Sequence, residues 1–188
     1  MVFLTVCRNI ADSTALLWLF FLFLLPVFGF HSYIAAPLEA YDDGLNLPDA
    51  RFGYTPDELN LWYDRIGVEG CRMYKLAADW DMYAIMIIYP LFLGSMLVKS
   101  ARIAGMSERM AYLPLVTVAC DVVETYFQRE GCILYPERLT DGQIILASYA
   151  NRLKWAGLVL SMTLIVALFV PATLSSRPSQ KEGEAKTE

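Results

Sequence analysis

Long runs of apolar residues, separated by polar segments, form the dominant pattern of the chain. A helix needs about 20 mostly apolar residues to cross a membrane. Four runs in the chain are close to this length or exceed it. They cover residues 15–36, 82–98, 106–126 and 144–170. The pattern therefore predicts an all-α, polytopic membrane protein with four transmembrane helices.

The polar segments complete the predicted organisation. We expect residues 1–14 to form an N-terminal tail, residues 15–172 a membrane domain and residues 173–188 a disordered tail. A polar loop, 37–81, separates the first two spans. A signal peptide is the alternative interpretation of the first apolar run, although the run exceeds the usual apolar region of about 7–15 residues.

The polar loop contains a predicted extramembrane helix. Thr55 is suited to cap this helix, and Glu58 completes a capping box three residues later. Apolar residues follow at spacings of three and four over residues 57–66, which gives the helix one apolar face. We expect Gly67 to end the helix and Gly70 to begin a further break.

Composition and charge narrow the class of protein. Hydrophobic residues make up 56% of the chain and charged residues 19%, against about 25% charged residues in ordinary soluble domains. The net charge of −5 argues against nucleic acid as a partner, because phosphate binding needs patches of Lys and Arg. His31 is the single histidine, so motifs with two histidines are excluded, and its place at the end of the first span indicates an interfacial residue. We predict no metal and no cofactor.

Basic residues predict the orientation in the membrane. The short connection between the second and third spans carries Lys99, Arg102 and Arg109 against Glu108. Connections rich in Lys and Arg stay in the cytoplasm. Four spans place both termini on the side of this connection, so we expect the N- and C-termini to be cytoplasmic. Which membrane holds the protein is left open.

Two of the four cysteines fall on the opposite side of the predicted membrane. Cys71 and Cys132 lie in the first and third connections, where an oxidising compartment would allow a disulfide. Two free thiols are the alternative. Cys7 and Cys120 fit no disulfide, because one lies on the cytoplasmic side and the other within the third span.

Asp121 and Glu124 are the most informative residues of the sequence. They are three apart in the third span and share one helical face. An ionisable residue at membrane depth costs about 2.5–3.5 kcal/mol on insertion scales, and such residues face a polar interior. We interpret the two carboxyl groups as a candidate catalytic acid–base pair in an intramembrane cavity.

Other interpretations remain open for this pair and for the basic residues of the fourth span. The carboxylates could form a structural ion pair with a basic residue of the fourth span, for which Arg152 and Lys154 are the candidates. Both basic side chains could instead extend to the membrane surface. The third span could also end near Val123, which would leave Glu124 among the lipid head groups.

Polar residues of the second and fourth spans complete the predicted site. Asp81 begins the second span, and Tyr89 follows on roughly the same side. The fourth span adds Asn151, Lys154 and Trp155. We expect these five residues to bind a ligand in the cavity that the candidate acid–base pair lines.

Four segments of the sequence resemble a group of small four-helix membrane proteins. They are FGYTPDELNLWYDRIGVEGCRMY, DWDMYAIMIIYPLFLGSML, LPLVTVACDVVET and ILASYANRLKW. The resemblance covers roughly residues 52–170. The group has an Asp before a Tyr/Phe-Pro helix, an Asp-x-x-Glu-Asn element and a late Leu-Lys-Trp, and Thr125 stands here in place of the Asn. The resemblance implies the four-helix architecture and says little about function.

Three functions fit the sequence. The first is binding or conversion of a lipid-like or sterol-like ligand, by analogy with sterol isomerases and the sigma-2 receptor, which also place carboxylates in an intramembrane cavity but share no residue-by-residue match with this chain. The second is a small transporter or ion-coupled carrier that uses the same carboxylates. The third is a non-catalytic accessory or assembly subunit. Membrane lipid and partner membrane subunits are the expected partners.

Overall fold

The structure is a computed structural model that describes residues 1–39 and 47–175, and within these ranges all regular elements are helical. The α-helices are α1 (Val2–Ala11), α2 (Thr14–Glu39), α3 (Pro56–Trp80), α4 (Met86–Ile103), α5 (Leu113–Leu134) and α6 (Asp141–Ser175). Short 3-10 helices η1 (Pro48–Ala50) and η3 (Glu108–Tyr112) precede α3 and α5, and a π-helical segment, η2 (Asp81–Ile85), joins α3 to α4.

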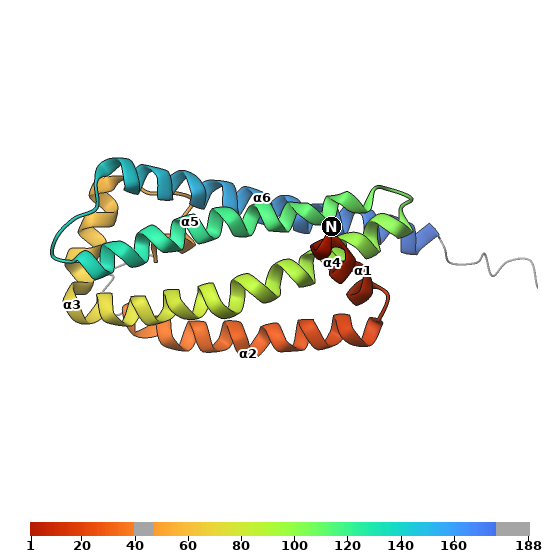
Figure 1. Ribbon diagram of the computed structural model, residues 1–188, viewed down its shortest axis with the longest axis horizontal. Helices are drawn as coiled ribbons and strands as arrows, with labels where there is room; N and C mark the ends of the chain where they lie inside the picture. Colours follow the sequence, from red (N-terminus) through yellow and green to blue (C-terminus); the bar gives the residue numbers. More distant parts are fainter. Residues whose placement is uncertain (40–46, 176–188) are drawn as a thin grey trace, which may run out of the picture.

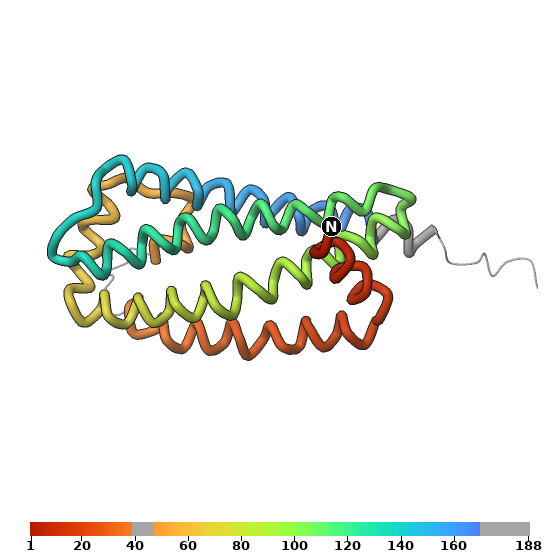
Figure 2. The backbone as a smooth tube through the Cα atoms, in the orientation of Figure 1, coloured from red at the N-terminus to blue at the C-terminus, as the bar shows by residue number. Residues whose placement is uncertain are grey.

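Four stretches are long and apolar enough to cross a membrane, as the sequence predicts: Thr14–Leu38, Pro56–Ile103, Glu108–Leu134 and Asp141–Phe169. The helices α2, α4, α5 and α6 extend along the long axis of the molecule (Figure 1). The tube in Figure 2 shows that α1 and the end of α4 lie at one end, whereas α3 lies at the other. The two ends of the bundle are therefore built from different parts of the chain.

The N-terminal segment differs from the prediction of a tail, because residues 2–11 form α1 and pack on the bundle. Cys7 and Ala11 are buried with Val98 of α4. Gly94 permits this close approach, since a Cβ there would lie 2.8 Å from the sulfur of Cys7. Arg8 fixes the exposed side of α1 through an ion pair of 2.5 Å with Glu108.

The predicted start of the extramembrane helix and its break at Gly67 are confirmed. Thr55 and Glu58 form the full capping box, with bonds of 3.3 and 2.6 Å. Gly67 has φ +60° and ψ −166°, a conformation that favours glycine. The first half of α3 consequently lies across the end of the bundle (Figure 1).

The predicted break at Gly70 is wrong, and the helix that contains the second predicted span begins before residue 82. The chain stays helical from Val68 through η2 to Ile103. The buried residues Cys71, Tyr74 and Ala78 recur at helical spacing along the second half of α3. The polar composition of this segment predicted a loop. The buried face stabilises it as a helix.

The helices that contain the last two predicted spans also have bounds that differ from those of the spans. Instead of 106–126, α5 covers Leu113–Leu134, because η3 occupies the start of the predicted span. The backbone of α6 remains helical through Pro171, where its end was predicted, up to Ser175. A proline removes one backbone donor and its ring crowds the carbonyl four residues earlier, yet the helix continues beyond this position. The rest of the predicted disordered tail, 176–188, lies outside the described residues.

Candidate functional site

The centre of the site is Lys154 of α6, whose ammonium lies between two carboxylates of α5. Its Nζ is 2.7 Å from Glu124 Oε2 and 3.3 Å from Asp121 Oδ1. The side chains of Lys154, Asp121 and Glu124 are only 11%, 9% and 0% exposed. One buried cation therefore serves two buried anions, which is the ion-pair arrangement that the sequence left as one alternative.

Close packing of α5 on α6 brings these groups together. Thr117, Asp121, Glu124 and Gln128 are all buried on one face of α5, at spacings of four, three and four. Gly157 of α6 lies against this face, and a Cβ there would be 2.4 Å from Thr117 Oγ1. A glycine at this position lets the two backbones approach closely enough for Lys154 to reach both acids.

Glu124 lies behind Lys154, in a closed polar network. Its carboxylate accepts hydrogen bonds from Gln128 Nε2 at 2.8 Å and from Asn151 Nδ2. The position of Glu124 inside α5, fully buried, contradicts the interpretation that the span ends near Val123. Glu124 thus has three partners inside the protein: two amides and the ammonium of Lys154.

Three tyrosines surround Gln128 and close the network towards α3. Gln128 Nε2 donates to Tyr54 Oη at 3.1 Å, Tyr74 donates to Gln128 Oε1, and Tyr63 donates to the Gln128 backbone carbonyl at 3.0 Å. Burial, reinforced by the nearby charge of Glu124, raises the pKa of Tyr54. The phenol therefore stays protonated and available as a hydrogen-bonding group.

The segment 47–54 covers the polar centre and is attached to α6 by hydrogen bonds. Trp155 Nε1 donates to the Asp49 carbonyl at 3.0 Å, and the backbone N–H of Gly53 donates to Asn151 Oδ1 at 3.0 Å. The N–H of Tyr54 donates to Ser148 Oγ at 2.9 Å. Asn151 thus joins this covering segment to Glu124 rather than facing open space.

A cavity of about 610 Å³ lies next to the polar centre. Its walls come from α2, η1, η2, α4, α5 and α6. Its charged and titratable lining residues are His31, Asp49, Asp81, Tyr89, Asp121 and Lys154, and its apolar lining includes Leu24, Phe28, Phe92 and Leu158. Phe28 is 46% exposed, and Ser32 and Ala50 are also exposed, so these residues mark where the cavity meets the surface.

Hydrogen bonds orient the carboxylates that line the cavity. Tyr89 Oη donates to Asp121 Oδ2 at 3.3 Å, and Thr125 Oγ1 donates to Asp81 Oδ2 at 3.4 Å. Asp81 begins the π-helical segment, and such wide turns are frequent at functional sites. Asp81 and Asp121 thus approach the same space from two different spans.

The predicted site residues divide into two groups. Asp81, Tyr89, Asp121, Lys154 and Trp155 line the cavity, whereas Glu124 and Asn151 do not. Arg152 takes no part in the centre, since its guanidinium lies over the ring of Tyr149 at 5.6 Å.

Sequence reasoning missed two titratable lining residues, His31 and Asp49. His31 lines the cavity although its position predicted an interfacial residue, and Asp49 lies in a segment predicted as loop. Asp49 Oδ1 is buried without a hydrogen-bond partner among the described residues. For Asp49 the local sequence contained no signal, since the fold of the covering segment brings it to the site.

Within residues 1–39 and 47–175, no cluster of His, Cys, Asp or Glu side chains is arranged to hold a metal ion. Comparisons of the chain with models of protein families, with curated proteins and with solved structures found no match. The resemblance to a group of four-helix membrane proteins accordingly stays a prediction. The chemistry of the cavity is what remains to indicate function.

Proposed function

We propose that the chain is a four-span membrane protein that binds a lipid-like or sterol-like amphiphile in the cavity beside Lys154. The observation that carries this proposal is the cavity itself. One continuous space of about 610 Å³ joins a polar end, with Asp81, Asp121 and Lys154, to the apolar residues Leu24 and Leu158. Its volume falls within the about 300–1,000 Å³ typical of sites for small molecules.

The distribution of apolar side chains supports insertion in a membrane. On α2, Trp18, Leu22, Phe23 and Leu25 are each at least 56% exposed, and α6 exposes a similar set: Leu153, Val159, Leu160, Met162 and Val166. The buried side chains of α5 and α6 are in contrast partly polar or charged. Apolar residues outside and polar residues inside are the arrangement that a lipid environment favours.

The ends of the bundle support the proposed orientation. Arg8, Lys99, Arg102 and Arg109 belong to α1, the end of α4 and η3, which lie at the same end (Figure 1). The end of α6 lies there as well. The end of α4 and the short connection to α5 carry Lys99, Arg102 and Arg109 against Glu108, and short connections rich in Lys and Arg are typical of the cytoplasmic side, so we propose that both termini are cytoplasmic.

A bound amphiphile would place its head group at the polar end of the cavity and its apolar part between α2 and α6. The carboxylates of Asp81 and Asp121 accept hydrogen bonds from a hydroxyl or amine, and Lys154 and Tyr89 donate to an oxygen. The exposed Phe28 at the edge of the cavity provides an apolar entrance from the side. Such an entrance suits a ligand that arrives from the bilayer.

Conversion of the ligand is a second candidate function, and the favouring observation is that two carboxylates line one cavity. Asp81 and Asp121 both face the ligand space, where one acid and one base can move a proton between two carbons. We assign Glu124 to a different role, because it is fully buried and bonded to protein groups. In this assignment Glu124 positions Lys154, and Asp121 contacts the ligand.

The test of binding is mass spectrometry of lipids retained by the purified full-length protein. We expect the wild-type protein to retain a defined amphiphile through extensive washing, and Asp121→Asn to retain markedly less. Asp57→Asn is the matched control, because Asp57 is exposed at the start of α3 and lies outside the cavity. Identical lipid profiles for the wild-type and Asp121→Asn proteins would contradict the proposal.

A further inference from the structure

Cys71 of α3 and Cys132 of α5 belong to one buried cluster at the end of the bundle that is opposite to α1 (Figure 2). Both are buried, at 3% and 8% exposure, in one cluster with Tyr63 and Tyr74. Their side chains are close enough to interact electrostatically. The structure holds them as free thiols, so the two sulfur atoms are adjacent without being joined.

The two cysteines lie next to the polar network of the candidate site. Cys71 is three residues before Tyr74 and Cys132 is four residues after Gln128, spacings that place each pair on one helical face. Tyr74 and Gln128 are themselves hydrogen-bonded to each other. A bond between the two sulfurs would therefore join α3 to α5 one turn away from this hydrogen bond.

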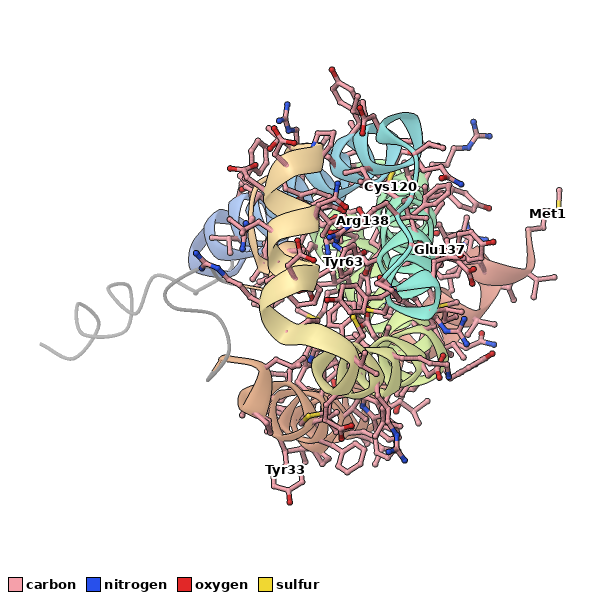
Figure 3. The ribbon with its side chains drawn as sticks, turned by 90° about the vertical axis from the view of Figure 1, so that its left-hand side faces the viewer. Met1, Tyr33, Tyr63, Cys120, Glu137 and Arg138 are labelled. Atoms are coloured by element: carbon pink, nitrogen blue, oxygen red, sulfur yellow. The ribbon has the colours of Figure 1, made fainter. Side chains whose placement is uncertain are left out.

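This end of the molecule is the one viewed in Figure 3. The first half of α3 crosses in front of the other helices, with Tyr63 between it and α5. Cys71 follows the break at Gly67, at which α3 changes direction. A link at Cys71 would hold the second half of α3 on α5 just beyond the break.

We propose that Cys71 and Cys132 form a disulfide that fastens α3 to α5 beside the Tyr74–Gln128 layer. The proposal rests on the orientation proposed above, which places this end on the side away from the cytoplasm, where disulfides persist. The oxidant is a disulfide of an oxidoreductase or of glutathione. A thiolate of this pair attacks that disulfide to form a mixed disulfide, and the second thiolate then attacks the cysteine sulfur of the mixed disulfide and displaces the oxidant's thiolate. One S–S bond forms and the S–S bond of the oxidant breaks. The two protons that the cysteines lose are taken up by the oxidant, which leaves as two thiols.

Because both cysteines are buried in the folded protein, the exchange takes place during folding. With both sulfurs almost inaccessible, the oxidant reaches them before α3 closes over α5 during folding. The same burial then protects the finished bond from reductants, since exchange requires access of a thiolate to sulfur.

The other two cysteines serve as internal standards. Cys7 is buried against α4 at the opposite end, where burial raises the pKa of its thiol. Cys120 lies within α5, between the two ends. Both are expected to remain thiols and to be labelled once the protein is denatured.

Counting of free thiols tests the proposal on full-length protein from its native membrane. Thiol exchange is stopped with acid, the protein is denatured, and a polyethylene-glycol maleimide is added with or without prior reduction. Because the chain has four cysteines, we expect two labels without reduction and four labels after it. Four labels without reduction would overturn the proposal.

Variants identify the pair that is oxidised. Cys71→Ser should carry three labels with and without reduction, because Cys132 loses its partner. The double variant Cys7→Ser, Cys120→Ser should carry none without reduction and two after it. If reduction exposed new labels only on Cys7 or Cys120, the result would contradict the assigned pairing.

An N-terminal tag separates this inference from the proposed orientation. Protection of the tag from protease in sealed vesicles shows on which side the terminus lies. Four free thiols with a cytoplasmic tag would refute the disulfide alone. Four free thiols with the tag on the other side would refute the disulfide together with the orientation on which it rests.

Discussion

The interior of the bundle is polar near α3 and apolar near α1. Near α3, the buried face of α5 presents Thr117, Asp121, Glu124 and Gln128 to Asn151 and Lys154 of α6. Further along, Leu93, Leu97 and Ile165 belong to a hydrophobic cluster with Leu24 and Val27 of α2. Among the residues that the structure describes, this cluster contains no charged residue. The same four long helices thus enclose two interiors of opposite character.

The difference between the two interiors separates residues that only pack from residues whose charges need partners. Apolar contacts between helices gain little in lipid, because lipid tails are as apolar as the side chains. A buried charge, in contrast, must be paired or it destabilises the protein. The polar interior therefore sets the register of α5 against α6, and its charged groups also face the cavity beside Lys154. The apolar interior needs no explanation beyond packing.

The largest expected effect is that of Lys154→Met, which would leave Asp121 and Glu124 without their shared cation. Breaking a buried ion pair by removing one partner costs about 3–5 kcal/mol. We expect a large loss of thermal stability or of monodisperse protein in size-exclusion chromatography. Lys154→Arg, which keeps the charge, should lose much less. Equal stability of the two variants would show that the ion pair does not hold α5 to α6.

A smaller effect is expected from Gly157→Ala, which tests the close approach of α5 and α6. The added Cβ would lie 2.4 Å from Thr117 Oγ1, and overpacking of this kind costs about 1–3 kcal/mol. Gly142→Ala is the matched control on the same helix, because a Cβ there meets nothing within 4 Å. Thermal unfolding in one detergent compares the two variants, and equal midpoints would contradict the proposed contact.

The smallest effect is expected from Glu108→Gln at the opposite end of the bundle. Glu108 accepts from Arg8 and Arg102 at 2.5 Å each, but these side chains are partly exposed. Exposed ion pairs contribute about 0–1 kcal/mol and weaken with salt. The unfolding midpoint should fall slightly at low ionic strength and match the wild type at high ionic strength. If Glu108→Gln lowered the unfolding midpoint as much as Lys154→Met does, the proposed difference between the buried and the exposed ion pairs would be contradicted.

The sequence was sufficient to predict what depends on local periodicity. Four apolar runs predicted four long apolar helices, and spacing alone placed Asp121 and Glu124 on one face. The capping box at Thr55 and the break at Gly67 also followed from local chemistry. These features depend on residues within one or two helical turns of each other.

Features that depend on tertiary packing escaped prediction. The apolar residues of α1 pack on the bundle because Gly94 of α4 leaves room for Cys7. Glu124 differs from Asp121 in its surroundings because Asn151 and Gln128 bind it, which spacing along α5 does not reveal. Asp49 reaches the cavity through hydrogen bonds between its segment and Trp155, some hundred residues away in the chain.

The most direct test of ligand binding in the cavity is photo-crosslinking with an amphiphile that carries a diazirine in its apolar part. Cross-linked peptides of the full-length protein in nanodiscs are then located by mass spectrometry. We expect labels on the cavity-lining segments of α2 and α6, around Phe28 and Leu158, and competition by the unlabelled amphiphile. Labels spread evenly over the outer faces of the helices, with no competition, would contradict binding in the cavity.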